Sequence, residues 1–181
     1  MPNQKNKSLI NHLDRIEVMR SELLEEVKLL SEEQINSSPS KKEWSILEII
    51  EHLVLGEEYV MSSIFRSEEP THRKRKPYHF VRYYIVMGIL SSSFKVKTPS
   101  KKMNPSSNSS LEELNKRWKY NHQTIRDYLM SLNSETVKKA VFFHPISGPL
   151  KPDKALKMLE VHLKRHWKQI KRLTNTSFVN T

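Results

Sequence analysis

The sequence predicts an all-α protein: a four-helix bundle with an elaborated connection between the second and third helices. Apolar residues recur at the three- and four-residue spacing of an amphipathic helix in four separate segments. The chain holds only three glycines, which argues against a hairpin-rich β architecture because tight turns need glycine. Its length of 181 residues suits one hydrophobic core, so we predict a single domain over residues 1–181, with a core at about 8–174.

The first two helices are predicted from an apolar stripe and a capping signal. An amphipathic pattern from Leu9 to Leu30 predicts the first helix over residues 8–30, and a stretch rich in serine and proline at 37–40 ends it. The second helix begins at the capping box Ser45-Ile-Leu-Glu48, in which each side chain accepts a hydrogen bond from the other residue's backbone N–H. Its apolar stripe continues to Ile64.

The last two helices carry similar signals at their starts. A second capping box, Ser110-Leu-Glu-Glu113, opens the third helix, whose apolar positions extend to Leu132. Pro152 suits the first position of the fourth helix, since a proline there gives up no helical hydrogen bond. The connection at residues 67–108 is irregular, although residues 78–90 are apolar enough to form a short extra helix.

Composition excludes several classes of protein. The chain has no cysteine, so disulfides, zinc–thiolate sites and cysteine nucleophiles are excluded. The longest apolar run, residues 83–90, is too short to span a membrane, and residues 1–8 are not followed by the apolar segment of a secretory signal. We therefore expect a cytoplasmic protein with no membrane partner.

The charge balance is strongly basic, with 31 Lys and Arg against 20 Asp and Glu. The densest run, Arg73 to Lys76, lies among prolines and serines, where a loop is expected. A solvated basic loop is favoured over a phosphate-binding surface, because no recognition motif accompanies the run. No specific nucleic-acid partner is expected.

Three of the eight histidines stand apart by position. His162 and His166 are one helical turn apart, so their side chains project from the same face. His166 takes an apolar position in the stripe, and its imidazole must hydrogen-bond or ligate to offset its lost hydration. Two histidines at this spacing can converge on one ion, although such pairs also arise by chance. His52 lies at the edge of the second helix's stripe near Gly56, either as a ligand with free space beside it or as a boundary residue beside a packing notch.

Three motifs spread over nearly the whole chain carry a resemblance to a known family. They are the Trp44-Ser45 helix start followed by His52, the proline-marked stretch at 97–111, and His144-Pro-Ile-Ser-Gly148 followed by the His162–His166 pair. Together they resemble the DinB/YfiT-like family of metal-binding helical bundles. The resemblance implies that His52, His162 and His166 bind one divalent ion and leave positions open for water or substrate.

The same resemblance implies a function. It points to a metal-dependent enzyme acting on a small molecule, either a transferase that uses a low-molecular-weight thiol or a hydrolase. Zn or Ni is the expected ion, with Fe or Mn as further candidates. The alternatives are a non-catalytic bundle that binds a metal or ligand and, less favoured, a nucleic-acid-associated protein. Relatives of this kind often form homodimers, so a homodimer is a further expectation.

Other polar residues have open roles. His144 precedes a proline in the turn before the last helix, where it lines the site or only shapes the turn. Asn121 and His122 lie near the inner face of the third helix, as core polar groups or as substrate contacts. The candidates for a general base are the acids beside His52, namely Glu51, Glu57 and Glu58. Glu48 is not among them because the capping box accounts for it. The histidines expected at the surface are His12, His72 and His79.

Overall fold

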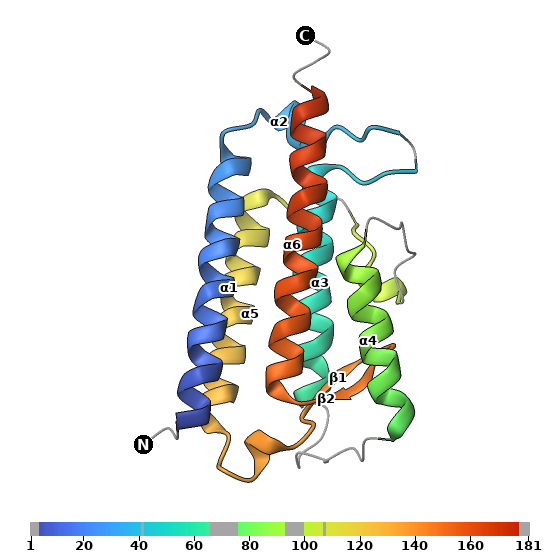
Figure 1. Ribbon diagram of the computed structural model, residues 1–181. Coiled ribbons are helices and arrows are strands. Elements are labelled where there is room, and N and C mark those ends of the chain that lie inside the picture. The colour runs from blue at the N-terminus through green and yellow to red at the C-terminus, as the bar shows by residue number, and fades with distance from the viewer. Residues whose placement is uncertain (1–3, 41, 66–75, 93–99, 107, 178–181) are drawn as a thin grey trace.

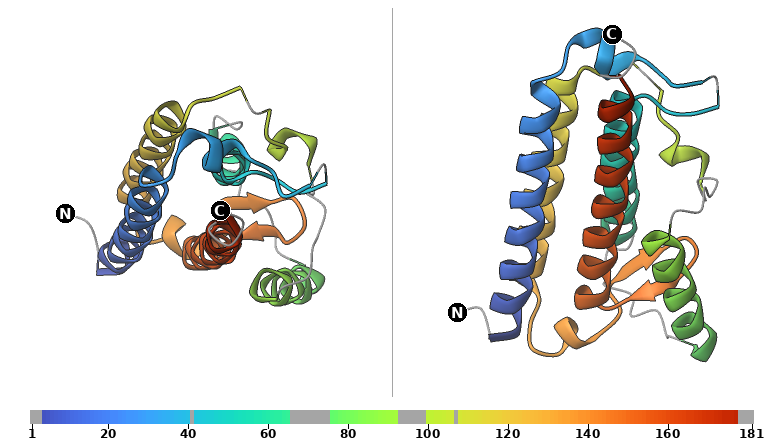
Figure 2. Two further views of the ribbon diagram at one scale, coloured as in Figure 1. Left: turned by 90° about the horizontal axis from the view of Figure 1, so that it is seen from above. Right: turned by 45° about the horizontal axis from the view of Figure 1, so that its top comes forward.

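The computed structural model is built around four long helices that contact one another in a ring (Figure 1). It describes residues 4–40, 42–65, 76–92, 100–106 and 108–177. The four are α1 (Gln4–Lys28), α3 (Ile46–Phe65), α5 (Leu111–Ser131) and α6 (Pro152–Ser177). Helix α1 contacts α5 and α6, and α3 also contacts both α5 and α6, which closes the ring seen from above in Figure 2. The prediction of an all-α protein is confirmed.

The predicted capping signals set two of the helix starts. The Ser45 hydroxyl accepts the Glu48 N–H at 3.2 Å, and the Glu48 carboxylate accepts the Ser45 N–H at 2.8 Å. The Ser110 hydroxyl likewise accepts the Glu113 N–H at 3.2 Å. Both helices then begin within one residue of the predicted positions, because each box satisfies N–H groups that the first turn leaves free.

Helix α1 begins four residues earlier than the predicted position, and Asn6 explains why. Its side chain is 1% exposed. The Asn6 amide donates to the carbonyl oxygens of Leu129 and Leu132, at 3.1 and 2.7 Å. These carbonyls end α5 and have no partner within that helix, so the extra turn of α1 satisfies them. This contact links two segments far apart in sequence, and the apolar pattern of either segment does not reveal it.

The connection between α3 and α5 contains the predicted extra helix, α4 (Pro77–Ser91), which packs against α6. On α6, Arg165 donates to the carbonyl oxygens of Ile89 and Ser92 and so fixes the end of α4. Short elements that the sequence did not predict complete the fold: α2 (Glu32–Asn36), η1 (Lys101–Met103), η2 (Thr136–Lys138), β1 (Phe142–His144) and β2 (Gly148–Leu150). None of the helices in the described ranges is long and apolar enough to cross a membrane.

Strands β1 and β2 form an antiparallel hairpin where only a turn was expected. Phe142 pairs with Leu150 and His144 with Gly148. Gly148 has a φ of 75°, and a Cβ there would lie 2.9 Å from the His79 ring, so both conformation and space require glycine. His79, which was expected at the surface, is partly exposed; one side of its ring packs here, and its Nδ1 accepts the Lys76 N–H at 3.1 Å.

Two other predicted surface histidines differ from each other in outcome. His12 is not a free surface residue, because its Nε2 lies 3.1 Å from the Glu160 carboxylate and its side chain is 18% exposed. This contact joins α1 to α6. His72 lies outside the described residues, as does most of the basic run from Arg73 to Lys76.

A buried polar network crosses the core between α1, α3 and α5. The His122 ring contacts Glu17 through Nδ1 and Glu57 through Nε2, the latter at 3.3 Å. The Trp118 indole donates to the same Glu57 oxygen at 2.7 Å, and the Arg20 guanidinium pairs with Glu17. Burial opposes protonation of His122, but the two carboxylates outweigh burial and raise its pKa to about 9. His122 is therefore a satisfied core cation, which was one of its two predicted roles.

Candidate metal centre

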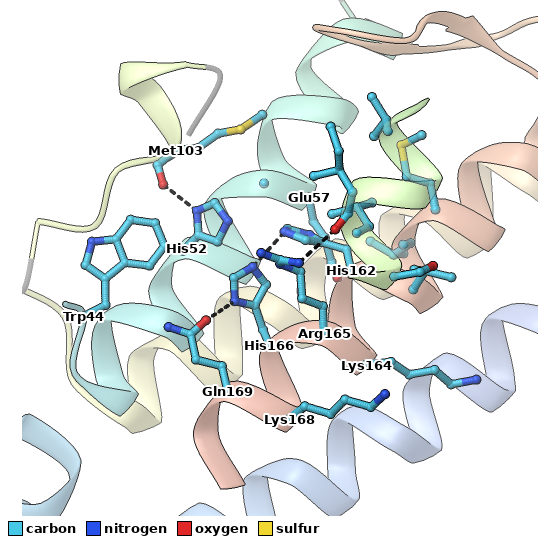
Figure 3. Close-up of a pocket in the computed structure, with 18 of the residues that line it drawn as sticks. Trp44, His52, Glu57, Met103, His162, Lys164, Arg165, His166, Lys168 and Gln169 are labelled. Atoms are coloured by element: carbon cyan, nitrogen blue, oxygen red, sulfur yellow. Dashed lines mark hydrogen bonds between the residues drawn. The ribbon is translucent and has the colours of Figure 1, made fainter. Parts of the chain in front are cut away.

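Three histidine side chains from two helices meet inside the molecule. His52 comes from α3, and His162 and His166 come from adjacent turns of α6. One ring nitrogen from each lies within 4.8 Å of the other two. The ring centroids are 4.7 to 5.2 Å apart and the planes are inclined by 67° to 83°, so the rings meet edge-on and are not stacked. Figure 3 shows the three labelled rings turned toward one another.

The orientation of His52 is set by a backbone carbonyl. Its Nδ1–H donates to the Met103 carbonyl oxygen at 2.9 Å, and the Trp44 ring packs against it with centroids 4.8 Å apart. A hydrogen bond at Nδ1 leaves the Nε2 lone pair for a ligand, as in many metal-binding histidines. His52 is 6% exposed, so little of the ring meets solvent.

Glu51 holds the segment that supplies this carbonyl. Its two carboxylate oxygens accept the Ser106 hydroxyl at 2.7 Å and the Ser106 N–H at 3.0 Å. These bonds tie the chain after η1 to α3, next to Met103. Glu51 was one candidate for a general base, and the structure instead shows it fastening the connection that orients His52.

His166 and His162 are oriented from within α6 and by the close approach of α3. The Gln169 side-chain oxygen accepts from His166 Nδ1 at 3.0 Å, which leaves the His166 Nε2 lone pair facing inward. His162 Nε2 lies 3.1 Å from His166 Nε2. A Cβ on Gly56 would lie 3.7 Å from the His162 ring, which is an ordinary van der Waals distance, so Gly56 packs beside this ring but the space does not require glycine.

The chemistry of these donors fits a divalent ion. Burial lowers the pKa of His52, and burial with the neighbouring rings lowers the pKa of His166 to about 3 and that of His162 well below its usual value. All three are therefore neutral near pH 7, which is the ligating form of imidazole. A tetrahedral ion with bonds of about 2.0–2.1 Å holds its ligand nitrogens roughly 3.4 Å apart, so small movements of these rings suffice.

The three histidines line a large cleft of about 2360 Å³. Its apolar wall includes Val86 and Leu90 from α4, and its rim carries Lys168 and Arg172 from α6. His144 also lines it, and its Nδ1 accepts the backbone N–H groups of Ile146 and Ser147 at 3.3 and 3.1 Å. Burial lowers the pKa of His144 to about 4, so its neutral ring carries the proton on Nε2. His144 thus lies both in the turn and in the wall of the cleft, and a contact with substrate stays a prediction.

Asn121 and Glu58 have partners that account for them. The Asn121 side chain is 1% exposed and donates to the Val54 carbonyl at 3.3 Å, and it is absent from the described residues that line the cleft. Asn121 therefore takes the first of its predicted roles, as a core polar group joining α5 to α3. Glu58 accepts two hydrogen bonds from Arg117, at 3.0 and 2.9 Å. Glu57 does line the cleft, with one oxygen held by Trp118 and His122.

Two contacts of the site were not predicted from the sequence. Gln169 lies three residues after His166, so the helical spacing could have indicated it. The Met103 carbonyl offered no such signal, because every residue has a backbone carbonyl and only the fold brings this one to His52.

Replacing Gln169 by Ala is expected to weaken binding of Zn²⁺ by about tenfold or more, because partners that orient a ligating histidine typically contribute this much to affinity. Competition with a chromogenic chelator measures the change. Gln123→Ala is the matched control, since Gln123 lies on the exposed side of α5, where its side chain donates to Asp127. Equal affinities in the two variants would show that Gln169 does not orient His166.

Fold and site together define a class, that of mainly helical proteins with a three-histidine cluster lining a cleft. Comparison with known families makes the assignment specific: the chain belongs to the DinB superfamily, whose sequence profile matches residues 15–170. No curated protein and no solved structure matches the chain.

Proposed function

We propose that this protein is a metal-dependent enzyme whose divalent ion is held by His52, His162 and His166. The observation that carries the proposal is the convergence of three histidine side chains, one from α3 and two from α6, in the wall of a cleft. Hydrogen bonds at Nδ1 of His52 and His166 already direct Nε2 inward, as a ligand set requires. Zn or Ni suits this donor set best, with Fe or Mn as further candidates.

Three protein ligands suit a catalytic site better than a closed structural one, because structural zinc sites use four protein ligands. When bound, a dication held only by neutral ligands acts as a Lewis acid and favours the deprotonated form of a thiol or water. Membership of the DinB superfamily and this ligand chemistry support a transferase that uses a low-molecular-weight thiol, or a hydrolase. The substrate is a small molecule in either case.

The cleft supports the transferase in particular. A pocket for one drug-sized ligand has a volume of about 300–1,000 Å³, and this cleft, at 2360 Å³, has room for a thiol and a second reactant together. Its apolar wall lowers the access of water to bound reactants. The His144 Nε2–H is available to donate a hydrogen bond to a polar atom of a reactant, since Nδ1 is occupied by backbone N–H groups.

The proposal is tested by turnover of chlorodinitrobenzene with a panel of small thiols and with water alone. Metal-loaded protein is expected to convert the electrophile, and both chelated protein and His52→Ala are expected to show only the uncatalysed rate. His144→Phe should keep the ion and lose part of the rate, because it removes a donor but no ligand. Equal rates for metal-loaded and chelated protein with every thiol and with water would remove the support for an enzyme of this type.

The second candidate function is a bundle that binds a metal or ligand without catalysis. It is favoured by the same histidine cluster, which joins α3 to α6 and could serve as a structural link. Full metal occupancy with no turnover, together with a large fall in unfolding temperature on chelation, would support this alternative. A cytoplasmic homodimer and weak, non-specific binding of nucleic acid stay predictions from the sequence.

A further inference from the structure

Helix α4 carries an unusual concentration of exposed apolar side chains. Of the ten exposed large hydrophobic residues in the described part of the chain, five lie on this 15-residue helix. They are Tyr78, Phe80, Val81, Tyr84 and Ile85, each 46% to 57% exposed. We call these five residues the α4 face. Single exposed apolar residues are common on soluble proteins, whereas a cluster of this kind marks an interaction surface.

The opposite side of α4 is firmly attached to the rest of the protein. Tyr83 and Val86 are 3% and 5% exposed, and the Lys154 ammonium lies 5.5 Å from the Tyr83 ring. Arg165 caps the end of the helix through two carbonyls. Because these contacts fix the rotation of α4 about its axis, they keep the five residues of the α4 face exposed. Figure 2 shows α4 lying beside α6 at the edge of the molecule.

Two positively charged side chains lie beside the Tyr78 end of the α4 face. The Lys76 ammonium and the Arg82 guanidinium lie 5.9 and 5.0 Å from the Tyr78 ring. In the sequence, no Asp or Glu occurs between Glu69 and Glu112, whereas nine Lys or Arg do. The formal charge of the whole chain is +11, so most of the excess lies in the connection that contains α4. The partner of this surface should therefore be negatively charged as well as partly apolar.

We propose that the α4 face docks on an anionic lipid surface. An interfacial helix places aromatic and aliphatic side chains at the boundary of the acyl chains while Lys and Arg meet anionic headgroups, and Tyr is enriched at that depth. Each cation near such a surface contributes about 1 kcal/mol. This proposal departs from the expectation of no membrane partner, which rested on the lack of an apolar run long enough to span a membrane; docking at the surface needs no such run.

Nucleic acid or a second copy of the chain would each complement only part of the α4 face and its charges. Nucleic acid would engage the cations and stack on the aromatic rings, but it would leave Val81 and Ile85 facing water. A second copy of the chain would cover the apolar residues, but it would bring two strongly cationic surfaces together. Apolar residues occur on both sides of α4, so the sequence pattern alone does not separate the docking face from the packed face.

Co-sedimentation of the full chain with vesicles tests the proposal. Binding is expected with vesicles of phosphatidylcholine containing about one third phosphatidylglycerol, little binding with phosphatidylcholine alone, and weaker binding as salt is raised. The double variant Phe80→Ser/Ile85→Ser should bind about tenfold more weakly because it removes two inserting side chains. Arg82→Gln should bind about fivefold more weakly because it removes one cation.

A matched control separates docking from general surface hydrophobicity. Tyr120→Ser/Met130→Ser removes two exposed apolar side chains from α5, which are 70% and 52% exposed, and should bind vesicles as the unchanged protein does. Equal binding by this control and by the α4 double variant would overturn the proposal. So would a stable dimer that the α4 double variant dissociates, or duplex DNA binding that only the α4 variants lose.

Discussion

Replacing His166 by Ala is expected to weaken binding of the divalent ion by more than about 100-fold. Loss of an outer partner alone costs about 10–100-fold in affinity, and loss of a ligand removes a metal–nitrogen bond outright. The remaining pair, His52 and His162, comes from two helices and cannot enclose an ion from three sides. The metal content of purified protein and titration against a chelator measure the loss.

His12→Ala is the control for this prediction. His12 is also a partly buried histidine in contact with α6, but it bonds to Glu160 and is not one of the described residues that line the cleft. Its removal should leave metal content unchanged. Full metal occupancy in the His166→Ala variant, with a folded circular dichroism spectrum, would show that the ion is bound elsewhere.

The second large effect is expected in the buried network around His122. Replacing His122 by Gln removes a buried cation and leaves Glu57 and Glu17 without their shared partner. Breaking a buried ion pair in this way typically costs about 3–5 kcal/mol, so the free energy of unfolding at pH 7 should fall by about 3 kcal/mol. Urea denaturation of the two proteins measures the difference. His12→Gln again provides the control histidine.

The loss of unfolding free energy in His122→Gln should become smaller as the pH rises. The pKa of His122 is raised from 6.5 to about 9 in the folded protein, so its contribution is fully present below pH 6.5 and is lost as the pH rises through 9. The difference between the unchanged protein and His122→Gln should therefore shrink from pH 6.5 to pH 9. A difference that stays constant over this range would show that His122 is not protonated in the folded state.

Glu17 contributes to the dependence of stability on pH at the acidic end, with the opposite sign. Burial raises its pKa, but hydrogen bonds from His122 and Arg20 outweigh burial and lower the pKa from 4.5 to about 2. Its contribution to stability is therefore present above pH 4.5 and is lost as the pH falls through 2.

Most of the helical framework could be predicted from the sequence, because it depends on local features. The boxes at Ser45 and Ser110 determine their helix starts through bonds between residues three apart, and Pro152 begins α6 as predicted. The early start of α1 depends on Asn6 reaching the end of α5, a contact across more than 100 residues. No local pattern carries that information.

The candidate site likewise has features that local sequence patterns predict and features that only the folded chain brings together. The spacing of His162 and His166 indicates that they share a face, whereas the addition of His52 depended on a family resemblance because α3 and α6 meet only in the folded chain. The Met103 carbonyl and the contact of Glu51 with Ser106 lie beyond any sequence pattern. The contacts of His12 and His79 were not predicted for a related reason, since a lone histidine shows no sign of the distant acid or glycine against which it packs.

Anomalous X-ray scattering at the absorption edge of the bound metal, from crystals of the protein as purified, tests the central proposal most directly. We expect one strong peak per chain in the wall of the cleft, within about 2.0–2.1 Å of Nε2 of His52, His162 and His166. Open coordination positions should face the cleft. Crystals grown with the metal that lack a peak between the three rings, or that place it among other side chains, would contradict a metal site at these histidines.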